Sequence, residues 1–155
     1  MKNSSVLPNE KLQIGDAAVK GLFNGFIAGI GMAVVLVAAG LLSDVPAAST
    51  LDLFTPVSGS GPLTGLLAHL AISGIYGMVF GLLWSTVLRW LRTDSVLWWA
   101  VLSGAAYGLL LWLGAQFILL PTTGAAPGSI PAGQFLLAHL VYGLILGWLF
   151  GRNMS

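Results

Sequence analysis

Four long apolar stretches dominate the chain, at residues 18–43, 62–90, 96–120 and 131–151. Each is long enough for a helix to cross a hydrocarbon core about 30 Å thick, which takes roughly 20 residues. A closed β-barrel also satisfies its backbone in lipid, but its strands alternate polar and apolar residues over about 10 positions. The chain shows no such alternation. It therefore predicts an all-α integral membrane protein, a four-helix transmembrane bundle in a single membrane domain, residues 1–155.

The charged residues are few, at 7% of the chain, and they predict how the bundle is oriented. All six cations fall before or at the start of the first stretch, at the end of the second or between it and the third, or after the fourth, and by the positive-inside rule those segments face the cytoplasm. These cations are Lys2, Lys11, Lys20, Arg89, Arg92 and Arg152. We expect both termini to be cytoplasmic in a bacterial inner membrane. A net charge of +1 without a basic run gives no indication of nucleic-acid binding.

Most tryptophans gather at the predicted cytoplasmic ends of the spans, where an amphipathic ring sits well among lipid headgroups. These are Trp84, Trp90, Trp98, Trp99 and Trp148. At the opposite ends, residues 47–54 predict a short interfacial helix before the second span.

The second and fourth stretches share a repeated motif. Residues 66–70 and 136–140 both read Leu-Leu-Ala-His-Leu, and the residues that follow recur with the same offset of 70: Gly77, Phe80 and Gly81, then Gly147, Phe150 and Gly151. A fainter match at an offset of 83 relates the first stretch to the third: Gly21, Gly25 and Gly31, then Gly104, Gly108 and Gly114. We predict two tandem helical hairpins, about 18–90 and 96–151, after a polar cytoplasmic leader at 1–17.

Small residues recur at four-residue spacing in every predicted span. Helices in lipid associate largely by close backbone approach at such residues. We expect helix packing through Gly21, Gly25, Gly77, Gly81, Gly104, Gly108, Gly143, Gly147 and Gly151.

The only two histidines, His69 and His139, occupy equivalent positions of the repeat and hence similar depths. Three interpretations stay open. In the first, the imidazoles are structural hydrogen-bonding groups. In the second, they are the two axial ligands of a b-type haem, or each ligates a chlorin. In the third, they handle protons or a small solute, because ionisable residues inside membranes are candidates for function. Beyond the haem and chlorin interpretations, the sequence does not indicate a cofactor.

Other polar side chains could share this layer or continue it along the bundle axis. Their alternative role is ordinary interhelical hydrogen bonding. The residues are Gln116, Gln134, Ser73, Tyr76, Tyr107 and Tyr142.

Catalysis is not predicted. The chain lacks cysteine, an intramembrane carboxylate pair and the recurrent hydrolase and zinc motifs. Two histidines fall short of the three protein ligands that catalytic zinc usually has, so no metal site is predicted.

At the fourth span, His139-Leu140-Val141-Tyr142-Gly143 followed by Gly147 resembles a pattern in small uncharacterised bacterial inner-membrane proteins, the YagU-like group. The resemblance covers about residues 134–151 and implies a bacterial multi-span protein.

Together these features predict a non-catalytic accessory or scaffold subunit. Its partners are the lipid bilayer and either other membrane subunits or further copies of the chain. The alternatives are an electron-transfer protein with His69 and His139 on haem b, and a small-solute or proton channel or carrier.

Overall fold

This computed structural model describes residues 14–55, 60–88, 95–119 and 131–152, and nearly all of them are helical. The long helices are α1 (Ile14–Leu42), α3 (Pro62–Leu88), α4 (Val96–Gly114) and α6 (Ala132–Arg152). A short helix, α2 (Ala47–Asp52), follows α1, and one π-helical segment, η1 (Ala115–Leu119), continues α4. Four helical segments are long and apolar enough to span a membrane, which confirms the predicted number of spans.

The residues at several helix ends explain where those helices begin or end. Pro62 is the first residue of α3, and the Pro131 carbonyl accepts hydrogen bonds from the first turn of α6, in keeping with the preference of proline for helix starts. After α1, the Gly40 carbonyl accepts the N–H groups of Ser43 and Val45 around Asp44, which has a left-handed φ of 59°. Helix α1 begins at Ile14, so it includes the last residues assigned to the polar leader. The short helix expected at residues 47–54 is present as α2.

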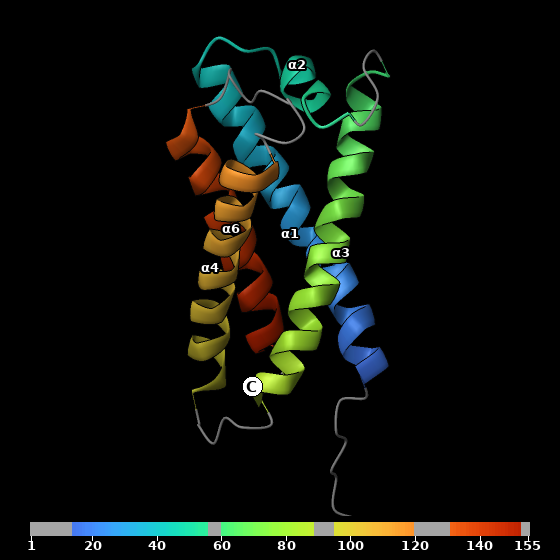
Figure 1. Ribbon diagram of the computed structural model, residues 1–155, viewed down its shortest axis with the longest axis vertical. Coiled ribbons are helices and arrows are strands. Elements are labelled where there is room, and N and C mark those ends of the chain that lie inside the picture. Colours follow the sequence, from blue (N-terminus) through green and yellow to red (C-terminus); the bar gives the residue numbers. More distant parts are fainter. Residues whose placement is uncertain (1–13, 56–59, 89–94, 120–130, 153–155) are drawn as a thin grey trace, which may run out of the picture.

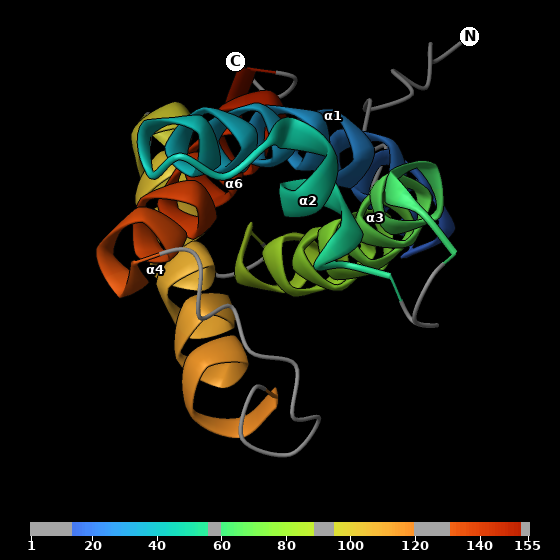
Figure 2. The ribbon, with the colours of Figure 1, turned by 90° about the horizontal axis from the view of Figure 1, so that it is seen from above.

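The four long helices form a curved row rather than a closed square (Figures 1 and 2). Helices α1 and α6 pack together in the middle, α3 packs on α1, α4 packs on α6, and α3 barely touches α4. The start of α1, the end of α3, the start of α4 and the end of α6 lie at one end of the molecule, and α2 lies at the other (Figure 1). We call these the terminal end and the α2 end.

Helices α1 and α3 meet backbone to backbone. A Cβ atom added to Gly25 would lie 2.5 Å from the carbonyl oxygen of Ser73, and one added to Gly77 would collide with the backbones of Gly21 and Gly25. One turn further along α3, Gly81 faces the Ala17 carbonyl. No larger residue fits at these crossing points unless the helices separate.

Helices α4 and α6 meet in the same way. A Cβ on Gly104 would overlap the Gly143 carbonyl, and one on Gly108 would overlap the His139 carbonyl. On α6, Gly147 faces the carbonyl of Ala100. At the terminal end of the same helix, a Cβ on Gly151 would lie 2.8 Å from the Cα atom of Leu97.

The core lies where the two helix pairs meet. Leu36 of α1, Trp84 of α3, and Tyr142 and Leu146 of α6 are almost completely buried. Phe80 and Phe150 join them, with ring centroids 5.4 Å apart in an edge-on arrangement. The aromatic rings therefore link α3 to α6 across the middle of the bundle.

Candidate functional site

His69 lies on α3 and faces α1. Its Nε2 atom is 3.1 Å from the carbonyl oxygen of Gly29, and its side chain is buried. The Phe54 ring, just after α2, covers the imidazole with ring centroids 4.9 Å apart. This histidine is therefore held between α1, α3 and the segment that follows α2.

His139 lies on α6 and is bonded within its own helix. Its Nδ1 atom is 2.9 Å from the carbonyl oxygen of Phe135, one turn earlier, and the Phe135 ring packs edge-on against the imidazole at 4.4 Å. The side chain is as buried as that of His69. The two histidines occupy matched sequence positions, yet they use different nitrogens and different kinds of partner.

Opposite tautomers follow from these contacts. A backbone carbonyl only accepts hydrogen bonds, so the proton lies on Nε2 in His69 and on Nδ1 in His139 when the rings are neutral. We expect nitrogen-15 NMR of the reconstituted protein to show one ring protonated at Nε2 and the other at Nδ1. His69→Gln and His139→Gln variants assign the two sets of signals. Identical tautomers in both rings would contradict the structure.

Each imidazole has one ring nitrogen that is not bonded to its backbone carbonyl partner. Axial ligation needs an unprotonated nitrogen facing the iron, and a ligating histidine usually donates its other ring N–H to a carbonyl or carboxylate. Both histidines have that arrangement, with Nε2 left over in His139 and Nδ1 in His69, and the Phe54 ring covers the His69 imidazole. The groove described below is lined by neither histidine.

The remaining polar side chains do not form one connected layer among the described residues. Gln134 accepts a long hydrogen bond of 3.4 Å from the Ser43 hydroxyl, which ties α6 to the turn after α1. Gln116 lies in the π-helical segment η1. The π-helix lies beyond the end of α4, at a distance from the helix pair α1–α3 (Figure 2).

Hydrogen bonds from two tyrosines connect α3 to the second helix pair, α4 and α6. The Tyr142 hydroxyl of α6 donates to the Ser73 carbonyl at 2.7 Å, and the Tyr107 hydroxyl of α4 donates to the Tyr76 carbonyl at 2.9 Å. Both acceptors are backbone oxygens of α3, three residues apart. The Tyr76 side chain itself is 41% exposed.

We expect Tyr142→Phe to lower the free energy of unfolding by about 1 kcal/mol, because it deletes one buried interhelical hydrogen bond and leaves the ring in place. Titration with sodium dodecyl sulfate in mixed micelles, followed by circular dichroism, measures the change. Tyr76→Phe is the matched control and is expected to change stability by less than about 0.5 kcal/mol. Equal effects of the two variants would contradict the assigned contact.

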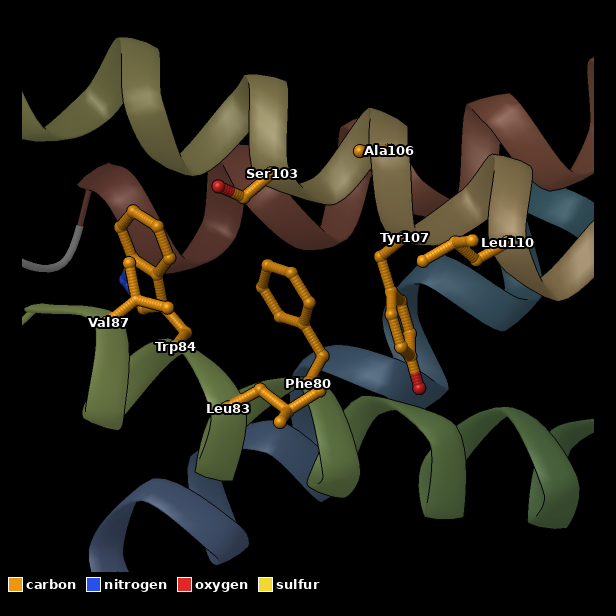
Figure 3. A pocket seen from close by; sticks show the side chains of 8 residues that line it. All are labelled: Phe80, Leu83, Trp84, Val87, Ser103, Ala106, Tyr107 and Leu110. Atoms are coloured by element: carbon orange, nitrogen blue, oxygen red, sulfur yellow. The ribbon is translucent and has the colours of Figure 1, made fainter.

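An apolar groove lies between α3 and α4, with a volume of about 240 Å³ (Figure 3). Its walls come from both helices: Phe80, Leu83, Trp84 and Val87 from α3, and Ser103, Ala106, Tyr107 and Leu110 from α4. We call this the α3–α4 groove. Sequence reasoning missed it, although the wall residues of α3 recur at the three- and four-residue spacing of one helix face.

Trp84 departs from the expected belt of interfacial tryptophans. It is 1% exposed, and its Nε1–H has no hydrogen-bond partner among the described residues, as is also true of Trp112 Nε1 and Asn24 Nδ2. Its large ring fills the space between the helices, and it stacks in parallel with Phe80 at 6.3 Å. Trp98, Trp99 and Trp148 are substantially exposed, as a lipid-facing ring requires. Trp90 lies outside the described residues.

No group of three or more His, Cys, Asp or Glu residues among the described residues could hold a metal ion. The functional features that the structure does bring together are two buried imidazoles, two interhelical tyrosine bonds and one apolar groove.

The fold and these features define an all-helical, multi-pass membrane protein. Residues 15–155 match a family described as a family of unknown function, DUF6789, and the chain belongs to that family. No curated protein and no solved structure matches the chain.

Proposed function

We propose that the chain is a non-catalytic membrane subunit that binds another membrane protein through the exposed side of α4. The supporting observation is the uneven burial of the spans. In the most apolar part of the third span only 17% of residues are buried, against 44% in α1 and in α6. Helix α4 packs on α6 and has little other support within the chain.

A duplicated hairpin explains why this side is open, and the backbone contacts support such a duplication. Gly25 faces the Ser73 carbonyl as Gly104 faces the Gly143 carbonyl, and Gly77 faces the Gly21 carbonyl as Gly147 faces that of Ala100. These pairs relate α1 to α4 at an offset of 79 residues (104 minus 25, and 100 minus 21) and α3 to α6 at 70. The contacts thus favour a register one helical turn away from the offset of 83 that the glycine pattern indicates.

The two hairpins do not use equivalent surfaces. A two-fold axis relating them would make the α1–α6 contact equivalent to a contact between α4 and α3. The α1–α6 contact is extensive, with Gly31 against Ile145, whereas α3 and α4 are separated by the groove. Among the described residues, α4 therefore lacks a second close neighbour such as α1 has in α6, and its exposed side, which carries Leu102 and Leu113, is available to a partner.

The proposed orientation places the terminal end in the cytoplasm of a bacterium, with the chain in the inner membrane. Lys20 of α1 and Arg152 of α6 both lie near that end, and Arg152 stacks on the Trp148 ring at 4.8 Å. No Lys or Arg falls among the described residues of the α2 end, which supports this direction. Arg89, Arg92, Lys2 and Lys11 lie outside the described residues. The YagU-like resemblance of the fourth span stays a prediction, and the proposed role does not depend on it.

Site-specific photocrosslinking in native membranes tests the proposed role. A benzophenone amino acid at Leu102 or Leu113, on the exposed side of α4, is expected to give a protein adduct of defined mass. The matched control is Val34, which is 63% exposed on α1. Adducts from α4 positions alone would support the proposal. Lipid adducts alone at all three positions would overturn it, as would the same protein adducts from Val34.

A further inference from the structure

The α3–α4 groove has the dimensions of a site for one hydrocarbon chain. Its wall residues extend over eight residues on each helix, from Phe80 to Val87 and from Ser103 to Leu110, a rise of about 10 Å. A single turn of a helix about 10–12 Å wide takes up roughly 400 Å³ or more, so a helix exceeds the 240 Å³ of the groove. Its walls are mostly apolar, and it opens sideways, where the surrounding bilayer would lie (Figure 3).

One wall residue carries an unused hydrogen-bond donor. Trp84 is almost wholly buried and its Nε1–H has no acceptor in the part of the chain that the structure describes, which is costly in a medium without water. In Figure 3 the indole nitrogen lies on the Val87 side of the ring, toward the terminal end of the groove. The Ser103 hydroxyl, on the opposite wall, points toward the same end. Trp84 Nε1 and the Ser103 hydroxyl thus both lie toward the terminal end of the groove, whereas the Tyr107 hydroxyl lies toward the other end and is bonded to the Tyr76 carbonyl.

The depth of the Trp84 Nε1–H in the membrane matches that of the glycerol ester groups of a phospholipid. Trp84 lies four residues before the end of α3 at Leu88, about 6 Å along the helix. The glycerol ester groups of a phospholipid lie at this boundary between headgroups and hydrocarbon, and their carbonyl oxygens accept hydrogen bonds. The acyl chain below such an ester would run along the groove toward Tyr107 and Leu110.

We propose that the α3–α4 groove binds one acyl chain of a phospholipid from the leaflet at the terminal end, with Trp84 Nε1 donating to its ester carbonyl oxygen. The nitrogen has almost no exposed surface, so the carbonyl reaches it after a neighbouring side chain moves. Val87, 43% exposed and three residues further along the same helix face, is that neighbour. This inference does not rest on the partner role proposed for α4.

Native mass spectrometry of the full chain after extensive detergent washing tests the binding, with palmitoyl-oleoyl phosphatidylglycerol as the probe. The wild type is expected to retain one phospholipid. Ala106→Phe fills the groove from α4 and is expected to reduce the retained lipid at least about fivefold, because the ring occupies the space of the chain. Leu109→Phe, at an exposed α4 position outside the groove, is the matched control and is expected to retain the lipid.

A second comparison tests the hydrogen bond itself. The wild type is expected to prefer the diester lipid over its diether analogue, which lacks the carbonyls, by roughly fivefold. Trp84→Phe keeps a ring in place but removes the donor, so the preference is expected to disappear. Circular dichroism verifies that each variant keeps its helices.

Three results would overturn the inference. The first is no retained lipid in the wild type, and the second is equal retention by folded Ala106→Phe and Leu109→Phe. The third is a dimer or a protein adduct that Ala106→Phe abolishes, because the groove would then hold a helix. An α4 crosslink that survives in Ala106→Phe would leave the partner role standing whether or not lipid binds, so the two proposals fail separately.

Discussion

Replacing Gly77 with leucine is expected to lower the free energy of unfolding by roughly 3 kcal/mol or more. The reason is that a side chain at this position meets backbone, not a movable side chain. Its Cβ would collide with the Gly21 carbonyl oxygen and the Gly25 Cα atom of α1. The helices must separate to admit leucine, and separation also weakens the neighbouring contacts of Gly25 with Ser73.

Gly133→Leu is the matched control for this prediction. Gly133 is also helical, near the start of α6, but a Cβ there meets nothing within 4 Å. We expect its stability to stay within about 0.5 kcal/mol of the wild type, since leucine is also a better helix former than glycine. Unfolding in sodium dodecyl sulfate, followed by circular dichroism, compares the two. A Gly77→Leu protein as stable as Gly133→Leu would mean that α1 and α3 do not cross where the structure places them.

Replacing Phe80 with alanine is expected to cost about 3–5 kcal/mol, the range for removing a large ring from a packed core. Phe80 is 3% exposed and touches the aromatic rings of three residues on three helices. They are Trp84 of α3, Tyr107 of α4 at 5.3 Å and Phe150 of α6 at 5.4 Å. Deleting its ring therefore removes the main apolar link between α3 and the second helix pair.

The matched control for Phe80 is Phe23, which is 62% exposed on α1. Phe23→Ala removes the same number of atoms from a surface position and is expected to cost less than about 1 kcal/mol. The same detergent titration measures both variants. Similar losses for the two would indicate that ring burial in the bundle is not what stabilises this fold.

Gly77 and Phe80 represent the two kinds of contact that hold the helices together. Glycine lets α1 approach α3, and α4 approach α6, so that each pair becomes a tight hairpin. Aromatic rings then join the pairs, with Phe80 and Phe150 in contact and Tyr142 bonded to the Ser73 carbonyl. The α3–α4 groove is the space that this arrangement leaves unfilled.

Several features were predictable from local sequence. The apolar stretches gave the four spanning helices to within a few residues, because crossing a bilayer requires a continuous apolar run whatever the neighbours are. Pro62 and Pro131 marked two helix starts, since proline lacks the N–H that a first turn leaves unused. Residues 47–54 indicated α2 in the same way, from composition and position alone.

The tertiary structure decided which faces of these helices meet, and it made residues with matched sequences unequal. His69 bonds to α1 and His139 to its own helix, although both lie in the same Leu-Leu-Ala-His-Leu motif. Trp84 is buried in the core, whereas Trp98, with the same interfacial pattern, is exposed. A helical stretch in lipid is apolar on all sides, so hydropathy carries almost no information about rotation. Close packing of side chains from distant parts of the chain supplies it, and here that packing also opened the groove between α3 and α4.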